Sequence, residues 1–354
     1  MSNNFFNEIL GNHDLKDRLS KDVSDDRLSH AYILEGQKGS GRHTFALQTV
    51  AAIECEKRNV SDAFSFFSDS DSTSIPCGCC PSCKKILGGL SPDIKTVGLV
   101  DDRATVGVDS VRLVTGDMYT APNELSVKVY IMEDADLMTV QAQNALLLSL
   151  EEPPEYVLFF LLCQNAGDML ETVRSRAPTL RTQRIPSDMI ENHLLSHLKE
   201  AEDLKKRSES DWKSLLCVAE GSIGYAIELL NEKKLEGVLE DRAATKELID
   251  LLTRKNKLGA FDAISSFGTK RQEVCQRLML LQYALRDLLL IKKYEEASLC
   301  FFENAEEAHE LSESFTVKGL LKLYEASCKA LDDLDMNSNV RLTLIGMMQN
   351  AGLL

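Results

Sequence analysis

The stretch "EGQKGSGRHT", residues 35–44, follows the apolar run "AYIL" at 31–34 and leads into a second apolar segment. Its glycines Gly36 and Gly41 have the spacing of a phosphate-binding P-loop, with Gly39 between them. Glycines in such a loop let backbone N–H groups face a phosphate at a helix N-terminus. A strand before the loop and a helix after it are the required context, so we predict a P-loop fold. The alternative is a glycine-rich turn that binds no ligand.

The residues that would perform nucleotide chemistry are altered. Arg42 and His43 stand where a P-loop has Lys and then Ser or Thr. Arginine keeps the charge but is longer and planar, and histidine lacks the hydroxyl that binds Mg²⁺. Glu133 and Asp134 follow the apolar run 128–132, where a Walker B segment would lie, but in reversed order. Acidic residues that simply end a strand explain them equally well. We therefore do not expect this chain to hydrolyse ATP.

Apolar runs alternate with helical patterns through the first half of the chain. Short runs at 94–97 and 128–132 predict strands, and "YVLFFLL" at 156–162 is apolar on both faces, as in a central parallel strand. Asp109 is suited to cap a helix from 110 to 118. Strands that alternate with helices predict an α/β fold with a parallel sheet.

After about Ile185 the strand signal ends and the remaining chain reads as helix. Apolar residues then recur at intervals of three and four, which places them on one helix face. The clearest series is Val274, Leu278, Leu281, Leu285 and Leu288.

Four of the ten cysteines lie between residues 77 and 83. Cys77, Cys80 and Cys83 form C-x₂-C-x₂-C, and Cys55, near the end of the predicted P-loop helix, supplies a fourth thiol. Four thiolates suit a closed structural Zn²⁺ site. Cys79 can replace one of these ligands, and free buried thiols or an iron–sulfur cluster are alternatives. The scattered cysteines are expected in the core; they are Cys163, Cys217, Cys275, Cys300 and Cys328.

Composition limits the class of protein. The chain has 354 residues and a formal net charge of −15, so two or three domains are expected. An acidic chain is poorly suited to grip DNA alone, because phosphate affinity comes from clustered Lys and Arg. No apolar run reaches the roughly 20 residues of a membrane span, and the start of the chain lacks a secretory signal pattern. We expect a cytoplasmic protein without membrane contact, with a mobile Ser/Asp-rich insertion at 56–76.

Several motifs in fixed order resemble one known family. They are "LSHAYILEG" (28–36), the altered P-loop, the cysteine cluster, "VDSVRLV" (108–114), "VYIMEDADLMTVQAQNALLLSLEEPP" (129–154) and "TVRSRAPTLR" (172–181). Together they resemble the delta-prime subunits of bacterial DNA polymerase III clamp loaders, AAA+ proteins related to the gamma/tau subunits. The resemblance is strong over about residues 5–185 and weaker beyond. It also includes a cysteine at position 55 in the metal pattern.

The resemblance implies a subunit that does not hydrolyse ATP itself. Such subunits present an arginine finger to the ATP of a neighbour, and the matching residue is Arg176, after Ser175. The motif usually continues with Cys, where this chain has Ala177. Two alternatives stay open: Arg176 pairs with a carboxylate of its own chain, or Arg174, two residues earlier, takes the role instead. ATP-hydrolysing relatives carry an arginine in the lid helix where this chain has Gly224.

The resemblance also implies domains and partners. Residues 1–185 would form the AAA+ α/β domain with a Cys₄ zinc module at about 55–83, residues 186–235 a helical lid, and residues 236–354 a helical collar. The partners would be gamma/tau and delta subunits in a hetero-pentamer that loads a sliding clamp onto primed DNA. Two rival functions stay open, a catalytically active ATPase of gamma/tau type and a zinc-dependent DNA-binding module.

Overall fold

A computed structural model describes residues 6, 9–58, 74–99, 105–294, 299–302, 304–336 and 338–353 of this chain. Most of the insertion predicted at 56–76 therefore lies outside the described residues. The chain divides into two compact units, Met1–Ile190 with Gly221–Tyr225, and Glu191–Glu220 with Ala226–Leu354. Each unit is described by itself.

The described residues of the first unit form a sheet of five parallel strands in the order β2-β3-β4-β1-β5. The central strand β4 is buried along its whole length, which confirms the prediction of a central parallel strand at 156–162. The last strand was not predicted, because three residues of mixed polarity carry too little pattern. The strands are β1 (Ala31–Glu35), β2 (Ile94–Val97), β3 (Lys128–Met132), β4 (Val157–Cys163) and β5 (Thr179–Arg181).

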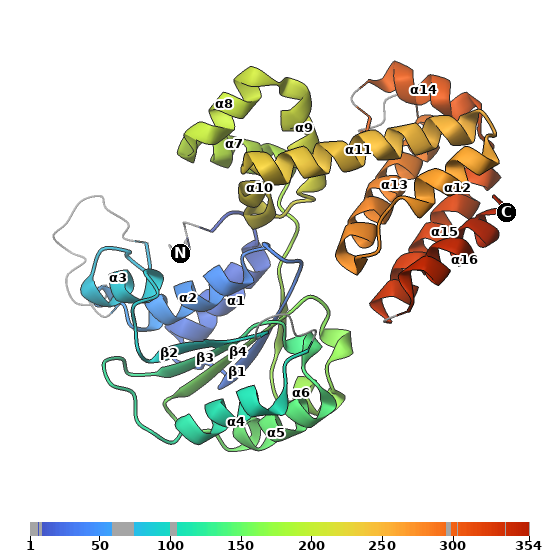
Figure 1. Cartoon of the computed structure of the whole chain (residues 1–354). Helices are drawn as coiled ribbons and strands as arrows, with labels where there is room; N and C mark the ends of the chain where they lie inside the picture. Colours follow the sequence, from blue (N-terminus) through green and yellow to red (C-terminus); the bar gives the residue numbers. More distant parts are fainter. Residues whose placement is uncertain are drawn as a thin grey trace. The chain divides into compact units, whose positions relative to one another are not determined.

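Helices cover both faces of this sheet (Figure 1). Along β1, the side chains of Tyr32 and Leu34 join a core with α1, α2 and α3, whereas Ala31 and Ile33 join a core with α4, α5 and α6. This alternation follows from the period of two in a strand. The helices are α1 (His13–Ser24), α2 (Arg42–Ile53), α3 (Pro81–Leu87), α4 (Val108–Asp117), α5 (Val140–Glu151) and α6 (Glu171–Arg174), with short 3₁₀ turns at Ala135–Leu137 (η2) and Ala166–Asp168 (η3).

The start of α4 differs from the prediction. The N-cap residue is Gly107, and Asp109 lies in the first turn of the helix rather than at its cap. A carboxylate in the first turn still interacts favourably with the helix dipole, which explains why the sequence suggested a helix start here.

The second unit is helical throughout its described residues, as predicted. The apolar series from Val274 to Leu288 is buried on one face of α13. No helix among the described residues combines the length and apolarity that a bilayer crossing requires. The division between units falls within α7 and α10. The helices are α7 (Ser187–His197), α8 (Lys199–Arg207), α9 (Glu209–Val218), α10 (Ile223–Leu229), α11 (Glu232–Thr253), α12 (Lys257–Ser265), α13 (Arg271–Ile291), α14 (Ala305–Glu313), α15 (Val317–Asp335) and α16 (Val340–Ala351).

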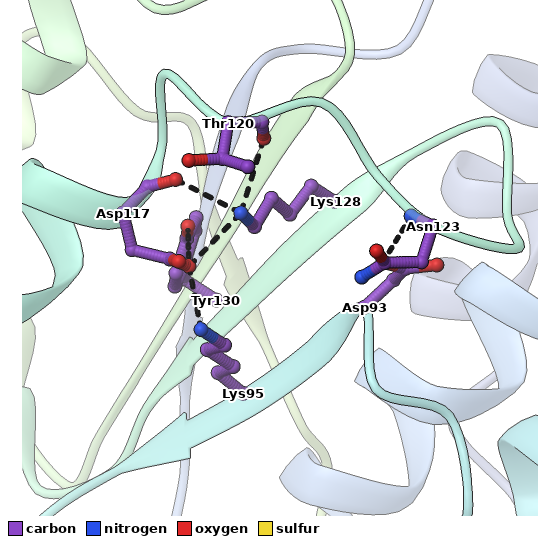
Figure 2. A network of polar contacts seen from close by, with 7 residues as sticks. All are labelled: Asp93, Lys95, Asp117, Thr120, Asn123, Lys128 and Tyr130. Carbon is purple, nitrogen blue, oxygen red and sulfur yellow. Dashed lines mark hydrogen bonds and ion pairs between the residues drawn. The ribbon is translucent and has the colours of Figure 1, made fainter.

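A polar network fixes the end of α4 to the sheet (Figure 2). The Oδ2 atom of Asp117 lies 2.7 Å from Lys95 Nζ and 3.0 Å from Lys128 Nζ, and Tyr130 donates a hydrogen bond to it. Lys128 also donates to the backbone carbonyls of Asp117 and Thr120. The hydrogen bond from Lys95 is the largest cause that lowers the pKa of Asp117. The network lies where β3 begins, so the opposite end of the sheet carries the glycine loop.

Candidate functional site

The glycine loop connects the end of β1 to the start of α2. Gly39 and Gly41 have φ values of 78° and 88°, which L-residues rarely adopt, and Gly41 is the N-cap of α2. Gly36 is favoured for a different reason: an added Cβ would lie only 1.8 Å from Thr182 Oγ1. The strand–glycine loop–helix order predicted from the sequence is therefore present.

One backbone N–H group of this loop is already used inside it. The Ser40 N–H donates to the Gln37 carbonyl at 3.1 Å, and the Ser40 hydroxyl accepts a hydrogen bond from Thr182. A phosphate cradle needs N–H groups that point at the ligand. The loop joins a strand to a helix as a P-loop does, and at least one of its N–H donors is bonded to an internal partner.

Arg42 and His43 occupy the first two positions of α2. Arg42 is 8% exposed, and its Nη1 atom has no hydrogen-bond partner among the described residues. His43 Nε2 lies 4.0 Å from Glu133 Oε1. An imidazole and a carboxylate therefore face each other where a P-loop hydroxyl and a Walker B carboxylate would hold Mg²⁺.

The acidic segment after β3 is partly structural. Glu133 donates its backbone N–H to the Val97 carbonyl at 2.7 Å. Asp134 has a φ of 49° and is the N-cap residue of η2. Asp136, which the sequence did not single out, accepts N–H bonds from Gln164 and Asn165 at the end of β4. It connects two neighbouring strand ends, and its place in the acidic run "EDAD" was the available signal.

The segment 221–225 lies directly on the glycine loop. The Gly224 N–H donates to the Gly39 carbonyl at 2.9 Å, and the Ser222 hydroxyl donates to the Lys38 carbonyl at 3.0 Å. A Cβ added at Gly224 would lie 2.8 Å from Gly39 Cα. A side chain at position 224, such as the arginine of ATP-hydrolysing relatives, would therefore require the backbone of the glycine loop to shift. The sequence showed that position 224 lacks the arginine of ATP-hydrolysing relatives, but it did not predict the contact of Gly224 with Gly39.

Arg176 follows the short helix α6 and has partners in its own chain. Its guanidinium forms an ion pair with Glu151 and donates to the Thr172 carbonyl at 2.8 Å. The Ser175 hydroxyl donates to the same carbonyl and lies 3.3 Å from Arg176 Nη1. The alternative raised from the sequence, a carboxylate partner within the chain, thus exists. The side chain remains 33% exposed.

The four cysteines chosen from their spacing lie together. The sulfurs of Cys55, Cys77, Cys80 and Cys83 are all within 4.8 Å of one another, which suits a tetrahedron with metal–sulfur bonds of about 2.3 Å. Backbone N–H groups of Cys80 and Cys83 approach the sulfurs of Cys77 and Cys80 at 3.4 Å. Cys79 lies 3.5 Å from Cys77 but is exposed and outside this group.

The surroundings of this cluster favour a bound cation. Burial raises the pKa of the thiols of Cys55 and Cys83, so their thiolate forms need a positive charge nearby. Cys55 follows α2, whereas Cys83 belongs to α3. A metal held by all four sulfurs would therefore join the two helices.

A parallel sheet whose β1–α2 loop has glycines at the spacing of Gly36 and Gly41 is typical of the P-loop class of α/β folds. Residues 11–186 match the family described as "DNA polymerase III, delta subunit". Over these residues the chain is similar to delta-type subunits of DNA polymerase III, and its curated relatives include gamma, tau and delta-prime subunits of that enzyme.

Similarity to individual proteins extends over most of the chain. The tau subunit of Bacillus subtilis DNA polymerase III is 25% identical over 352 residues, which are 95% of this chain and 59% of tau. The delta-prime subunit of the same organism is 26% identical over 337 residues, 94% of this chain and 92% of that subunit. A solved structure of a gamma-subunit-related protein from Thermotoga maritima has 18% identity and a TM-score of 0.43, and covers 95% of this chain and 98% of that one.

Proposed function

We propose that this chain is a non-hydrolysing clamp-loader subunit of delta-prime type. The observation that carries the proposal is the pair of His43 and Glu133, 4.0 Å apart at the two positions that would hold Mg²⁺. ATP hydrolysis in P-loop proteins needs a metal bound to the outer phosphates. This pair lacks the hydroxyl ligand, and the acidic residue faces an imidazole instead.

Two further contacts support a silent site. The Ser40 N–H is bonded within the loop, and the Gly224 N–H is bonded to the Gly39 carbonyl. Both contacts use the glycine loop for internal packing. In this proposal the loop keeps a structural role, and ATP with Mg²⁺ is not turned over by this chain.

The catalytic contribution is made in trans by Arg176. Its guanidinium is partly exposed and held at the end of α6 by Glu151 and Thr172. An arginine positioned in advance loses less freedom when it reaches a phosphate. Such a finger stabilises the charge that develops on the transferred phosphoryl group. Ser175 helps to position it through the contact at 3.3 Å.

The cysteine cluster is proposed to hold one structural Zn²⁺ through Cys55, Cys77, Cys80 and Cys83. Four sulfur ligands leave the metal no open position, so its contribution is to stability rather than catalysis.

The similarity to DNA polymerase III subunits supports a wider role. We propose that the chain assembles with gamma/tau and delta subunits into a hetero-pentamer that loads a sliding clamp onto primed DNA. Residues 1–185 would form the AAA+ domain and residues 186–235 the lid. Residues 236–354 would form a collar that packs against sister subunits, so that the chain provides one rigid wall of the ring.

The proposal is tested by Arg176→Ala in a loader reconstituted with gamma/tau and delta subunits. Assembly should be intact, while ATP turnover at the neighbouring site should fall by on the order of 10³-fold or more. Arg174→Ala is the matched control, because Arg174 is exposed and two residues earlier. Unchanged turnover in the Arg176 variant would reject the finger assignment.

A second candidate function is an active ATPase of gamma/tau type. The similarity to Bacillus subtilis tau over 95% of this chain favours it. It predicts that the isolated chain turns over ATP and that Arg42→Ala abolishes this activity. The proposed function predicts that the isolated chain does not turn over ATP, whether residue 42 is arginine or alanine.

A further inference from the structure

The second unit contains a pair of thiols outside the sites described above. Cys217 lies near the end of α9, and Cys300 lies in a short segment after α13. The sequence predicted both as core residues, yet both are partly exposed. They are 83 residues apart in the chain, yet each thiol is the largest influence on the pKa of the other, so the two side chains lie close together.

The segment that carries Cys300 is held by a buried carboxylate. Asp287 on α13 is fully buried, and its Oδ2 atom accepts backbone N–H bonds from Cys300, Phe301 and Phe302 at 2.8, 2.6 and 3.2 Å. Three bonds to one oxygen fix the backbone of this segment. The position of the Cys300 sulfur is therefore set by the fold.

A buried arginine brings α9 to the same place. Arg242 on α11 donates to the Ser214 hydroxyl and to the Phe301 carbonyl, and it lies 5.1 Å from the centre of the Phe301 ring. Ser214 and Cys217 are three residues apart on α9, so they share a helix face. The same arginine thus fixes the helix of one thiol against the segment of the other.

The charges around the pair act differently on the two sulfurs. Arg286 Nη1 donates to Cys300 Sγ at 2.9 Å. The hydrogen bond from Cys217 is the largest cause that lowers the pKa of Cys300 to about 6, with Arg286 adding to it and burial and Asp287 opposing it. The same hydrogen bond and burial raise the pKa of Cys217, although Arg242 opposes this. These contacts favour the thiolate form of Cys300 and the protonated form of Cys217.

We infer that Cys300 is a reactive thiolate for small hydroperoxides, and that Cys217 is the thiol that resolves it to a disulfide. The Cys300 sulfur attacks the peroxide, so an S–O bond forms and the O–O bond breaks. The released alkoxide or hydroxide takes a proton from water. The Cys217 sulfur then attacks Cys300, an S–S bond forms, and the hydroxyl leaves as water with the proton of Cys217. Two electrons pass from the thiols to the peroxide.

The first experiment measures alkylation of the full-length chain by iodoacetamide from pH 5 to 9, with each cysteine followed by peptide mass spectrometry. Cys300 should show a midpoint near its pKa of about 6. A pKa about 2.5 units below the ordinary value of about 8.5 gives roughly 30 times more thiolate at pH 7. The nucleophilicity of the thiolate falls about 13-fold, so Cys300 should react about twice as fast as an ordinary thiol. Cys328, whose pKa burial raises, is the internal reference.

Variants separate the roles of the neighbours. Arg286→Met should move the midpoint of Cys300 upward, whereas Arg254→Met, at the exposed C-cap of α11, should not. Hydrogen peroxide should produce a Cys217–Cys300 disulfide in the natural sequence. In Cys217→Ser the same treatment should leave a sulfenic acid on Cys300, trapped by dimedone. Circular dichroism checks that each variant is folded.

Two results would overturn the inference. One is a Cys300 midpoint near that of an ordinary thiol, about 8.5. The other is a low midpoint without any Cys217–Cys300 disulfide after peroxide treatment of the folded chain. Neither readout uses ATP turnover, so the result is independent of the proposed clamp-loader function.

Discussion

Replacement of Arg42 by methionine should make the first unit more stable. Arg42 is 8% exposed, and its Nη1 atom has no hydrogen-bond partner among the described residues. An unsatisfied buried donor lowers the stability of the folded state by about 1–3 kcal/mol. A cation in the first turn of a helix lowers it by roughly a further 0.3–1 kcal/mol, because it is repelled by the helix dipole. Methionine has a similar length and no donor to satisfy. We expect Arg42→Met to raise the free energy of unfolding by about 1–3 kcal/mol.

The assay must report on the unit that contains the glycine loop. Trp212, the single tryptophan, belongs to the second unit, so intrinsic fluorescence is unsuitable. Hydrogen exchange at peptides from β1 and α2, in buffer without phosphate or nucleotide, measures local opening. The expected gain corresponds to roughly 5- to 150-fold slower exchange.

The control is Arg112→Met on α4, where the arginine side chain is 70% exposed. A surface substitution of this kind changes stability by less than about 0.5 kcal/mol. Exchange in Arg42→Met that is as fast as in the natural chain, or faster, would refute the reasoning. The Arg42 guanidinium would then stabilise the first unit, although its Nη1 atom is buried without a hydrogen-bond partner among the described residues.

Other substitutions test the remaining features. Because the pKa of Asp117 is lowered, its carboxylate stabilises the fold above about pH 4 and loses this effect as the pH falls further. Asp117→Asn should therefore lower the free energy of unfolding by about 1–3 kcal/mol at pH 7, and by progressively less as the pH falls in acid-urea titrations. Asp109→Asn, exposed on the same helix, is the control and should change the free energy of unfolding little. Cys80→Ser should remove the single bound zinc expected for four sulfur ligands, measured by elemental analysis, whereas Cys79→Ser should retain it; zinc loss only in the second variant would change the ligand set. Gly224→Arg should increase hydrogen exchange in the glycine loop without creating ATP turnover, and a gain of turnover would contradict the steric argument.

The sequence predicted the elements with strong local patterns. The strands β1, β3 and β4, the glycine loop and the helical second half were all evident from apolar runs and spacing. Cys55 and the 77–83 cluster also lie together as their spacing suggested. These features depend on residues that are near one another in the chain, or on a motif with few alternative geometries.

Features that depend on distant contacts were not predictable in the same way. The packing of Gly224 on Gly39, the pairing of Glu151 with Arg176, and the meeting of Cys217 with Cys300 each join segments that no local pattern connects. The orientation of side chains and backbone donors across such contacts is set by tertiary packing. These contacts become evident only in the three-dimensional structure.

The outer strands of the sheet have a consequence for the behaviour of the protein at high concentration. Its two edges are β2 and β5, of only four and three residues. Lys95 lies on one edge, and Arg181 on the other is paired with Glu35. Short edges with charged side chains offer a poor template for another strand. The edges of this sheet are therefore poorly suited to pair with the edge strand of a second molecule.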